Sequence, residues 1–306
     1  MMMFGRRTEK RKPEPERQLY FERKLARRRT GLGNTQDSRR MNAFLTAALV
    51  IGLFLLIYPS AADYWNTIHQ KRAIMDYASQ VASMDRSDYE AMIRSAEDYN
   101  RRLAENKIKW EMSEEELADY EKQLSFNESR NMGFITIPKI SLELPVYHGI
   151  SYEVLQRSIG HMPETSLPVG GESSHCVLSG HRGLPSAKLF SDLDKLTEGD
   201  TFTLSILDES YTYEVDQIRV VVPSELAEIR IIPGLDLCTL VTCTPYGVNT
   251  HRLLVRGHRV DNPNGNALVV ADAMQLEPVF VTPFLMIPLI CGLLLLLLFA
   301  PVNANP

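Results

Sequence analysis

The sequence of 306 residues contains only four cysteines, two tryptophans and seven histidines. Four cysteines are too few for a disulfide-dense secreted scaffold, which holds a small domain together with several bridges. No Cys or His pair in the sequence has zinc-finger spacing, and neither an EF-hand loop nor an internal repeat occurs. We therefore expect no metal and no other cofactor, and we look for chemistry at the few Cys and His residues themselves.

The most informative cysteine is Cys243, which follows the β-branched and apolar run of residues 239–242. Such a run predicts a strand, and Pro245 predicts its end because proline has no N–H to donate to a sheet. After a turn-rich stretch, residues 252–257 predict a second strand. In an antiparallel hairpin of the two, Cys243 lies beside Arg252. A neighbouring guanidinium favours the thiolate, the nucleophilic form of cysteine, so Cys243 is the candidate nucleophile.

A base for this thiol is predicted at His181. Residues 174–179 predict a short strand, and the glycines and proline of residues 180–185 mark its exit into a loop, where functional side chains are common. Histidine is the side chain best suited to move protons near neutral pH. His181 and Cys243 are far apart in the sequence, so a small barrel or sandwich would have to bring the two strand ends together.

The other histidines and cysteines have simpler interpretations. His251 is the alternative base because it precedes an arginine, whereas His148 and His161 lie in glycine-flanked loops and are expected to make structural hydrogen bonds. Cys176 and Cys238 lie on predicted strands with apolar neighbours, where a cysteine is usually a small buried hydrophobe. A disulfide between these two is the alternative in an oxidising compartment.

Five ordered blocks of the sequence resemble those of sortases: residues 132–140, 144–149, 165–171, 179–183 and 239–257. Within that family the chain is most similar to class C, whose members polymerise pilins. The resemblance covers roughly residues 132 to 260 and implies a mainly β fold, a closed β-barrel of the sortase type. The many short predicted strands of this region are consistent with such a barrel.

The sortase resemblance implies a cysteine transpeptidase. Sortases cut an LPxTG-type sorting signal between Thr and Gly, and here Cys243 would be the nucleophile, His181 the general acid and base, and Arg252 the stabiliser of the oxyanion or of the substrate backbone. In class C the thioacyl enzyme then reacts with a lysine amine of a pilin subunit, which builds a pilus. The alternatives are a housekeeping sortase that anchors surface proteins to peptidoglycan and, ranked lower, a non-enzymatic surface assembly scaffold.

One class C feature is missing from the sequence. Members of this class usually carry a lid, an Asp-Pro-aromatic tripeptide that lies over the cysteine, and no Asp-Pro occurs between residues 63 and 129. The candidate replacement is the pair Lys109 and Trp110, in a charged linker between two predicted helices. In the alternative interpretation, Trp110 packs within the helical segment and covers no site.

Two uncharged apolar runs predict membrane segments. The first, in residues 41–58, is interpreted as an uncleaved anchor, with a cleaved signal peptide as the alternative because small residues follow at 60–62. The second, residues 279–302, is long enough to span a bilayer. Residues 1–40 hold 13 Lys and Arg against five Asp and Glu. The positive-inside rule therefore predicts a two-pass protein of the cell membrane with its catalytic domain outside the cell.

The expected domain plan has six consecutive parts: a basic cytoplasmic tail (1–40), the anchor (41–58), a helical stalk with the candidate lid (59–131), the sortase barrel (132–262), a linker (263–278) and a C-terminal transmembrane helix (279–302). The tail is expected to be disordered and to contact anionic lipid rather than nucleic acid. Besides membrane lipid, the expected partners are pilin or surface-protein substrates with LPxTG-type C-terminal signals.

Local signals predict further elements of the plan. Capping boxes at residues 87–90 and 113–116 predict two helix starts. Residues 202–206 and 211–215 alternate as half-buried strands do, and one helix is expected over residues 186–196. Four acidic residues near that helix are interpreted as solvated charges rather than as a calcium site: Asp192, Asp194, Glu198 and Asp200.

Overall fold

A computed structural model describes residues 14–105, 111–126 and 130–262 of the chain, together with residues 290 and 292. These residues divide into two compact units. One contains the first part of helix α1 (Glu14–Ala82) up to Ile57 with residues 290 and 292, and the other begins at Tyr58 and continues to residue 262. All the described strands belong to the second unit.

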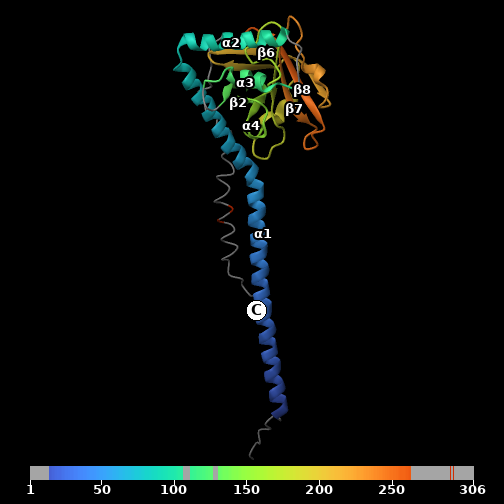
Figure 1. The fold of residues 1–306 in the computed structure, drawn as a ribbon. Helices are drawn as coiled ribbons and strands as arrows, with labels where there is room; N and C mark the ends of the chain where they lie inside the picture. Colours follow the sequence, from blue (N-terminus) through green and yellow to red (C-terminus); the bar gives the residue numbers. More distant parts are fainter. Residues whose placement is uncertain (1–13, 106–110, 127–129, 263–289, 291, 293–306) are drawn as a thin grey trace, which may run out of the picture. The chain divides into compact units, whose positions relative to one another are not determined.

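Eight strands in the described part of the chain form a closed barrel (Figure 1). They are β1 (Asn131–Ile137), β2 (Leu142–His148), β3 (Ile159–His161), β4 (Ser174–Ser179), β5 (Thr201–Ile206), β6 (Glu209–Val221), β7 (Asp236–Thr244) and β8 (His251–Val260). Around the barrel their order is β1-β2-β3-β4-β7-β8-β6-β5, and β5 pairs with β1 to close it. The predicted mainly β, closed-barrel fold is confirmed.

The composition of each strand reflects what covers it. In β5, Phe202 and Leu204 are buried while Thr203 between them is partly exposed, which is the alternation of a strand covered on one face. In β7, every residue from 237 to 242 is buried. A strand covered on both faces needs the continuous β-branched and apolar run by which it was predicted. As expected from Pro245, β7 ends directly before that residue.

Strands β4 and β8 flank β7 and determine which residues lie near its C-terminal end. β8 pairs with β7 antiparallel, with Cys243 opposite Arg252, so the predicted hairpin is confirmed. β4 pairs with β7 in parallel, with Ser179 next to Val241. A parallel pair needs a long crossover connection, and here the crossover contains strands β5 and β6.

Long helices precede the barrel and short ones connect its strands. Besides α1 they are α2 (Arg86–Glu105), α3 (Glu114–Lys122), α4 (Tyr152–Arg157), and the 3-10 helices η1 (Pro138–Ile140), η2 (Leu189–Lys195) and η3 (Leu226–Ile229). Helix α3 begins as predicted. The Ser113 hydroxyl accepts a hydrogen bond from the Glu116 N–H, and the Glu116 carboxylate accepts one from the Ser113 N–H. This capping box satisfies two amides that lack partners inside the helix.

The other predicted capping box was wrong. Helix α2 begins at Arg86, so Ser87 lies inside the helix rather than at its cap. The Asp85 carbonyl accepts the first helical hydrogen bond from the Tyr89 N–H. The Glu90 carboxylate pairs with Arg86, one turn earlier, at 2.8 Å. An (i, i+4) ion pair therefore replaces the return bond that would close the box.

Two further helix predictions need correction. The helix expected over residues 186–196 is the shorter η2, because Ala187 forms an isolated β-bridge with Leu184 before the helix begins. The basic arm, expected to be disordered, is helical from Glu14 onward as the start of α1. Its Arg, Glu and Leu residues have high intrinsic helix propensity, which the expectation, based on a composition typical of disordered segments, did not take into account.

The helices before the barrel contribute directly to its core. The Tyr77 hydroxyl of α1 donates a hydrogen bond to the Met132 carbonyl (2.8 Å) and accepts one from the Leu207 N–H (2.7 Å). The Asn100 side chain of α2 donates to the Leu167 carbonyl (3.1 Å) and accepts from the Leu167 N–H (2.7 Å). The segment interpreted as a stalk therefore packs on the barrel through buried, directional contacts.

Replacing Tyr77 by phenylalanine should lower the free energy of unfolding by roughly 1–3 kcal/mol, because the change leaves buried backbone groups of Met132 and Leu207 without a partner. In a domain of this size each kcal/mol corresponds to a fall in Tm of about 2–4 °C. Thermal unfolding followed by circular dichroism measures the shift. Tyr152→Phe is the matched control, because the Tyr152 ring is 72% exposed. Equal Tm values for the two variants would contradict the prediction.

One described helix is long and apolar enough to cross a membrane, judged by length and composition alone: it lies within residues Arg40–Ala82 of α1. It contains the anchor predicted in residues 41–58. The linker (263–278) and the second predicted span (279–302) lie outside the described residues apart from 290 and 292. The two-span part of the predicted fold therefore stays a prediction.

Candidate active site

Cys243 and Arg252 lie on a face of the barrel that also carries a small apolar cluster. Because side chains alternate along a strand, Cys243 is on the same face of β7 as Val241, and Arg252 is on the same face of β8 as Leu254. These two apolar residues belong to one buried group, here called the outer apolar cluster: Val177, Val221, Ile229, Val241 and Leu254. Cys243 thus lies at the edge of a buried apolar cluster and is itself partly exposed.

The hairpin holds the thiol and the guanidinium side by side. Cys243 and Arg252 are directly opposed in the β7–β8 ladder, and opposed residues have Cβ atoms about 4.5–5.5 Å apart. Arg252 Nη1 donates to the carbonyls of Asn249 (3.3 Å) and His251 (3.1 Å). These bonds direct the guanidinium toward the β7–β8 turn, so a group bound at that turn can contact both side chains.

His181 reaches the site from β4, on the other side of β7. The Gly180 N–H donates to the Val241 carbonyl (3.0 Å), and Thr242 Oγ1 donates to the Gly180 carbonyl (2.8 Å). His181 and Cys243 each follow directly after these last bonded residues, so a continued parallel register would set them side by side. The β4–β7–β8 order therefore sets all three predicted residues at the ends of adjacent strands, with Cys243 directly opposite Arg252.

The environment of His181 suits it to accept a proton. Its ring is partly buried, and this burial lowers the pKa of His181 below its ordinary value. The lower pKa favours the neutral imidazole over the imidazolium. The Phe190 N–H donates to the His181 carbonyl (3.1 Å), which holds the backbone of the residue in place. A neutral imidazole beside a thiol can take the thiol proton as the sulfur attacks.

Helix α1 supports the loop that follows His181. An Asp63 carboxylate oxygen accepts a hydrogen bond from the Lys188 N–H (2.7 Å), and the Asn66 side chain donates to the Ser186 carbonyl (2.6 Å). Sequence reasoning missed these contacts, which join residues more than a hundred positions apart. It also passed over Arg182, whose position directly after His181 was an available signal.

The other histidines differ from His181 in position. His148 Nε2 lies 2.7 Å from the Gln123 carbonyl, and His161 Nδ1 lies 3.0 Å from the Tyr120 hydroxyl. Both histidines are buried, as a structural role requires, although they end strands β2 and β3 rather than lying in loops. His251 is partly exposed at the start of β8 and remains the alternative base.

Cys176 and Cys238 are buried, as predicted. They are register neighbours on β4 and β7, and both are free, so the alternative disulfide is not formed. Burial raises the pKa of the Cys238 thiol well above its ordinary value, which keeps it protonated. Of the three thiols Cys176, Cys238 and Cys243, only Cys243 is partly exposed to solvent.

Of the four acidic residues near η2, Glu198 is exposed and the other three pair with cations. Asp192 lies 2.9 Å from Lys188 and 3.0 Å from Lys195, Asp194 pairs with Arg182, and Asp200 lies 3.6 Å from Lys139. Within the ranges that the structure describes, no group of three or more His, Cys, Asp or Glu residues is placed to hold a metal ion.

The solvent side of the site is bordered by the β7–β8 turn. Tyr246 and Val248 in this turn are each 64% exposed. The candidate lid residues Lys109 and Trp110 lie outside the described residues. The lid therefore stays a prediction.

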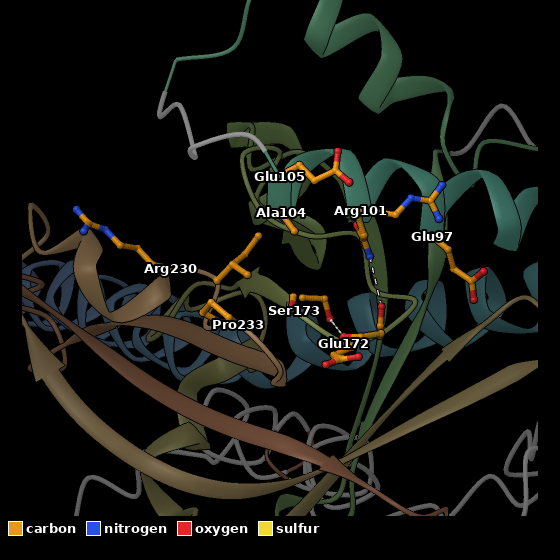
Figure 2. A pocket seen from close by; sticks show the side chains of 13 residues that line it. Glu97, Arg101, Ala104, Glu105, Glu172, Ser173, Arg230 and Pro233 are labelled. Atoms are coloured by element: carbon orange, nitrogen blue, oxygen red, sulfur yellow. Dashed lines mark hydrogen bonds between the residues drawn. The ribbon is translucent and has the colours of Figure 1, made fainter.

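A separate cleft of about 990 Å³ lies between α2 and the loops that precede β4 and β7 (Figure 2). Its lining includes Glu97 and Arg101 from α2 and Arg230 from the loop before β7. Because β4 and β7 are parallel, residues before these strands lie at the opposite end of the barrel from residues after them. The cleft is therefore distinct from the site around Cys243.

Comparison with known proteins gives concordant results. Residues 135–260 match the sortase domain family. Sortase D of Bacillus subtilis is 30% identical over 131 residues, which is 42% of this chain and 63% of that relative. The chain thus spans somewhat less than two thirds of that protein.

Two solved structures are similar over nearly their whole length. Sortase C1 of Streptococcus agalactiae is 59% identical with a TM-score of 0.62, and the match covers 62% of this chain and 99% of that one. Sortase C of Clostridium perfringens, solved with the C-terminal cell wall sorting motif, is 40% identical with a TM-score of 0.56, and the match covers 62% of this chain and 99% of that one.

Proposed function

Because the chain belongs to the sortase family, we propose that it is a membrane-anchored cysteine transpeptidase that polymerises pilins. The observation that carries the proposal is the position of Cys243, opposite Arg252 on one neighbouring strand and beside the end of β4 that leads to His181. The similar solved structures are of sortase C. This favours pilin polymerisation over the housekeeping alternative.

In the first half-reaction, Cys243 acquires the acyl group of the sorting signal. The thiol gives its proton to His181, and the sulfur attacks the threonine carbonyl carbon. The negative charge that develops on the carbonyl oxygen is stabilised by Arg252, which backbone carbonyls already orient. The intermediate collapses with cleavage of the Thr–Gly C–N bond, and His181 returns the proton to the leaving amine.

In the second half-reaction, a lysine amine of a pilin subunit attacks the thioester carbonyl and loses a proton to His181. The C–N bond of the isopeptide forms, the C–S bond breaks, and the Cys243 sulfur regains the proton. A peptidoglycan amine would react in the same way. The acceptor therefore distinguishes a pilus-building enzyme from a housekeeping one, whereas a surface scaffold would need none of this chemistry.

A similar solved structure supports an LPxTG-type substrate: sortase C of Clostridium perfringens was solved with the C-terminal cell wall sorting motif. The outer apolar cluster is only 0–8% exposed, so it supports the strands that carry the site from below. Leucine and proline of a bound signal would have to pack on other apolar surface near Cys243, at about 25 cal/mol per Å² buried.

The direct test is peptide transfer by the full chain in detergent micelles. The chain is incubated with a peptide that carries an LPxTG-type signal together with one acceptor. In one reaction the acceptor is a lysine-containing peptide blocked at its N-terminus, and in a parallel reaction it is oligoglycine. Mass spectrometry should detect the signal, cut after threonine, joined to the lysine ε-amine. Transfer to oligoglycine alone would favour the housekeeping alternative. No product and no adduct on the protein would contradict the proposed function.

Replacing Arg252 by alanine should lower the rate of adduct formation by about 10²–10³-fold, the usual effect of removing one oxyanion donor. The rate is measured by stopping the reaction at intervals and determining the intact mass. Arg219→Ala is the control. Arg219 lies on β6 and forms an exposed ion pair with Glu228 of η3, so this variant should retain the parental rate. A rate for Arg252→Ala close to that of this control would exclude the proposed role.

We also propose that the barrel lies outside the cell, because basic residues that precede an apolar anchor remain in the cytoplasm. The N-terminus is then inside, and so is the C-terminus if residues 279–302 also span the bilayer. Protease added to cells without their wall should degrade the barrel and spare an N-terminal tag. A protected barrel would refute this orientation, and a mature chain that starts near Ala61 would show that the anchor is a cleaved signal.

A further inference from the structure

The Arg182 side chain connects the two strand ends of the candidate site. Its Nη1 donates to Oγ1 of Thr244 (3.4 Å), and its guanidinium carbon lies 6.0 Å from the centre of the Tyr246 ring. Arg182 directly follows His181, and Thr244 directly follows Cys243. One side chain thus joins the loop that carries the candidate base to the turn that follows the candidate nucleophile.

The guanidinium is fixed at its far end by Asp194 of η2, with which Nη2 pairs. The Arg182 side chain is only 10% exposed, whereas that of Asp194 is 47% exposed. Arg182 Nε is buried and has no hydrogen-bond partner among the described residues. A buried guanidinium with an unpaired N–H is unfavourable in itself. Stability is therefore a weak explanation for this placement.

Backbone hydrogen bonds hold β4 and β7 together up to the site but end there. The last such bond joins the Gly180 N–H to the Val241 carbonyl, and His181 and Cys243 come after it. Beyond this point a side chain has to define the geometry. Arginine suits this task because its planar group can contact a hydroxyl, an aromatic ring and a carboxylate together, which the ammonium group of lysine cannot do.

We propose that Arg182 is a positioning residue for the reaction: it holds the turn after Cys243 against the loop after His181 and so sets the separation of the thiol and the imidazole. This inference rests on the proposed function, since it assigns a task in the same reaction. A displacement of about 1 Å between reacting groups can cost about 100-fold in rate. Loss of the Arg182 contacts should therefore lower kcat rather than weaken peptide binding.

The test compares Arg182→Lys and Arg182→Gln with the parent, as full chains in detergent micelles. The kcat and KM of transfer to a lysine peptide are measured along with the Tm. Both variants should lose roughly 10–100-fold in kcat while KM changes by less than about twofold. Asp194→Asn breaks the ion pair and leaves the contacts with Thr244 and Tyr246, so it should lose less kcat than either variant.

Arg256→Lys is the matched control. Arg256 also pairs with a carboxylate, Asp216, at 2.9 Å, and its side chain is 20% exposed, but it lies in the middle of β8. This control should keep the parental kcat even if its Tm falls. Two outcomes would overturn the inference. In the first, Arg182→Lys and Arg182→Gln both keep the parental kcat. In the second, Arg256→Lys loses as much kcat as they do when its Tm falls by the same amount. A parent chain that transfers no peptide would instead refute the proposed function itself.

Discussion

Replacing Cys243 by alanine should abolish both the thioacyl adduct and the transfer product, with a loss in kcat of roughly 10⁴–10⁶-fold, as expected when a covalent nucleophile is removed. The fold should survive, because Cys243 is a partly exposed residue near the end of β7 and belongs to neither buried core group. Neither Cys176 nor Cys238 can replace it, since both are fully enclosed in the barrel core.

Intact-mass analysis and peptide mapping after incubation with a sorting-signal peptide measure this effect. In the parent, the acyl group should be found on the peptide that contains Cys243. Cys176→Ala is the control and should still form the adduct. An adduct that survives in Cys243→Ala, or an acyl group on Cys238, would show that the nucleophile has been assigned wrongly.

Replacing His181 by alanine should lower kcat by about 10²–10⁴-fold, the typical contribution of a positioned proton-transfer group. The pH dependence gives a second signature. The first proton transfer needs a neutral imidazole, so the parental rate of adduct formation should rise with pH through the pKa of His181. Partial burial lowers that pKa below its ordinary value of 6.5, and the midpoint should therefore lie on the acidic side of 6.5. This rise of the rate with pH should be absent in His181→Ala.

His251→Ala is the control for the choice of base. His251 lies at the start of β8, opposite Thr244, and its removal should leave both the rate and the pH profile close to those of the parent. A near-parental rate in His181→Ala together with a large loss in His251→Ala would make His251 the base. Circular dichroism of both variants shows whether either change affects the fold.

Much of the site was predictable because its parts are local. The β-branched run before Cys243 and the proline after it define the end of β7, and the short turn returns the chain so that Arg252 lies opposite Cys243. The Ser113 capping box likewise predicted the start of α3. Each of these features depends on residues within about ten positions of one another, so propensity and turn chemistry suffice to specify it.

The predictions that failed depended on competition between local interactions. Ser87 and Glu90 match the capping pattern, but the Asp85 carbonyl and the ion pair of Glu90 with Arg86 start α2 two residues earlier. Likewise, the basic arm has the composition of a disordered segment, yet residues of high helix propensity make it helical from Glu14. A sequence pattern indicates which local interactions a segment can form. The relative free energies of these interactions decide which of them forms.

The sequence by itself thus determined several of the strands, the hairpin of Cys243 with Arg252, and the residue types able to carry out acyl transfer. Only the tertiary structure decided that β4 pairs in parallel with β7, that α1 supports the loop after His181, and that Arg182 reaches across to Thr244. These contacts join residues 62 or more positions apart. No local propensity encodes such contacts, because they form only when the packing of the whole barrel and its helices compensates the entropy lost in closing the intervening chain.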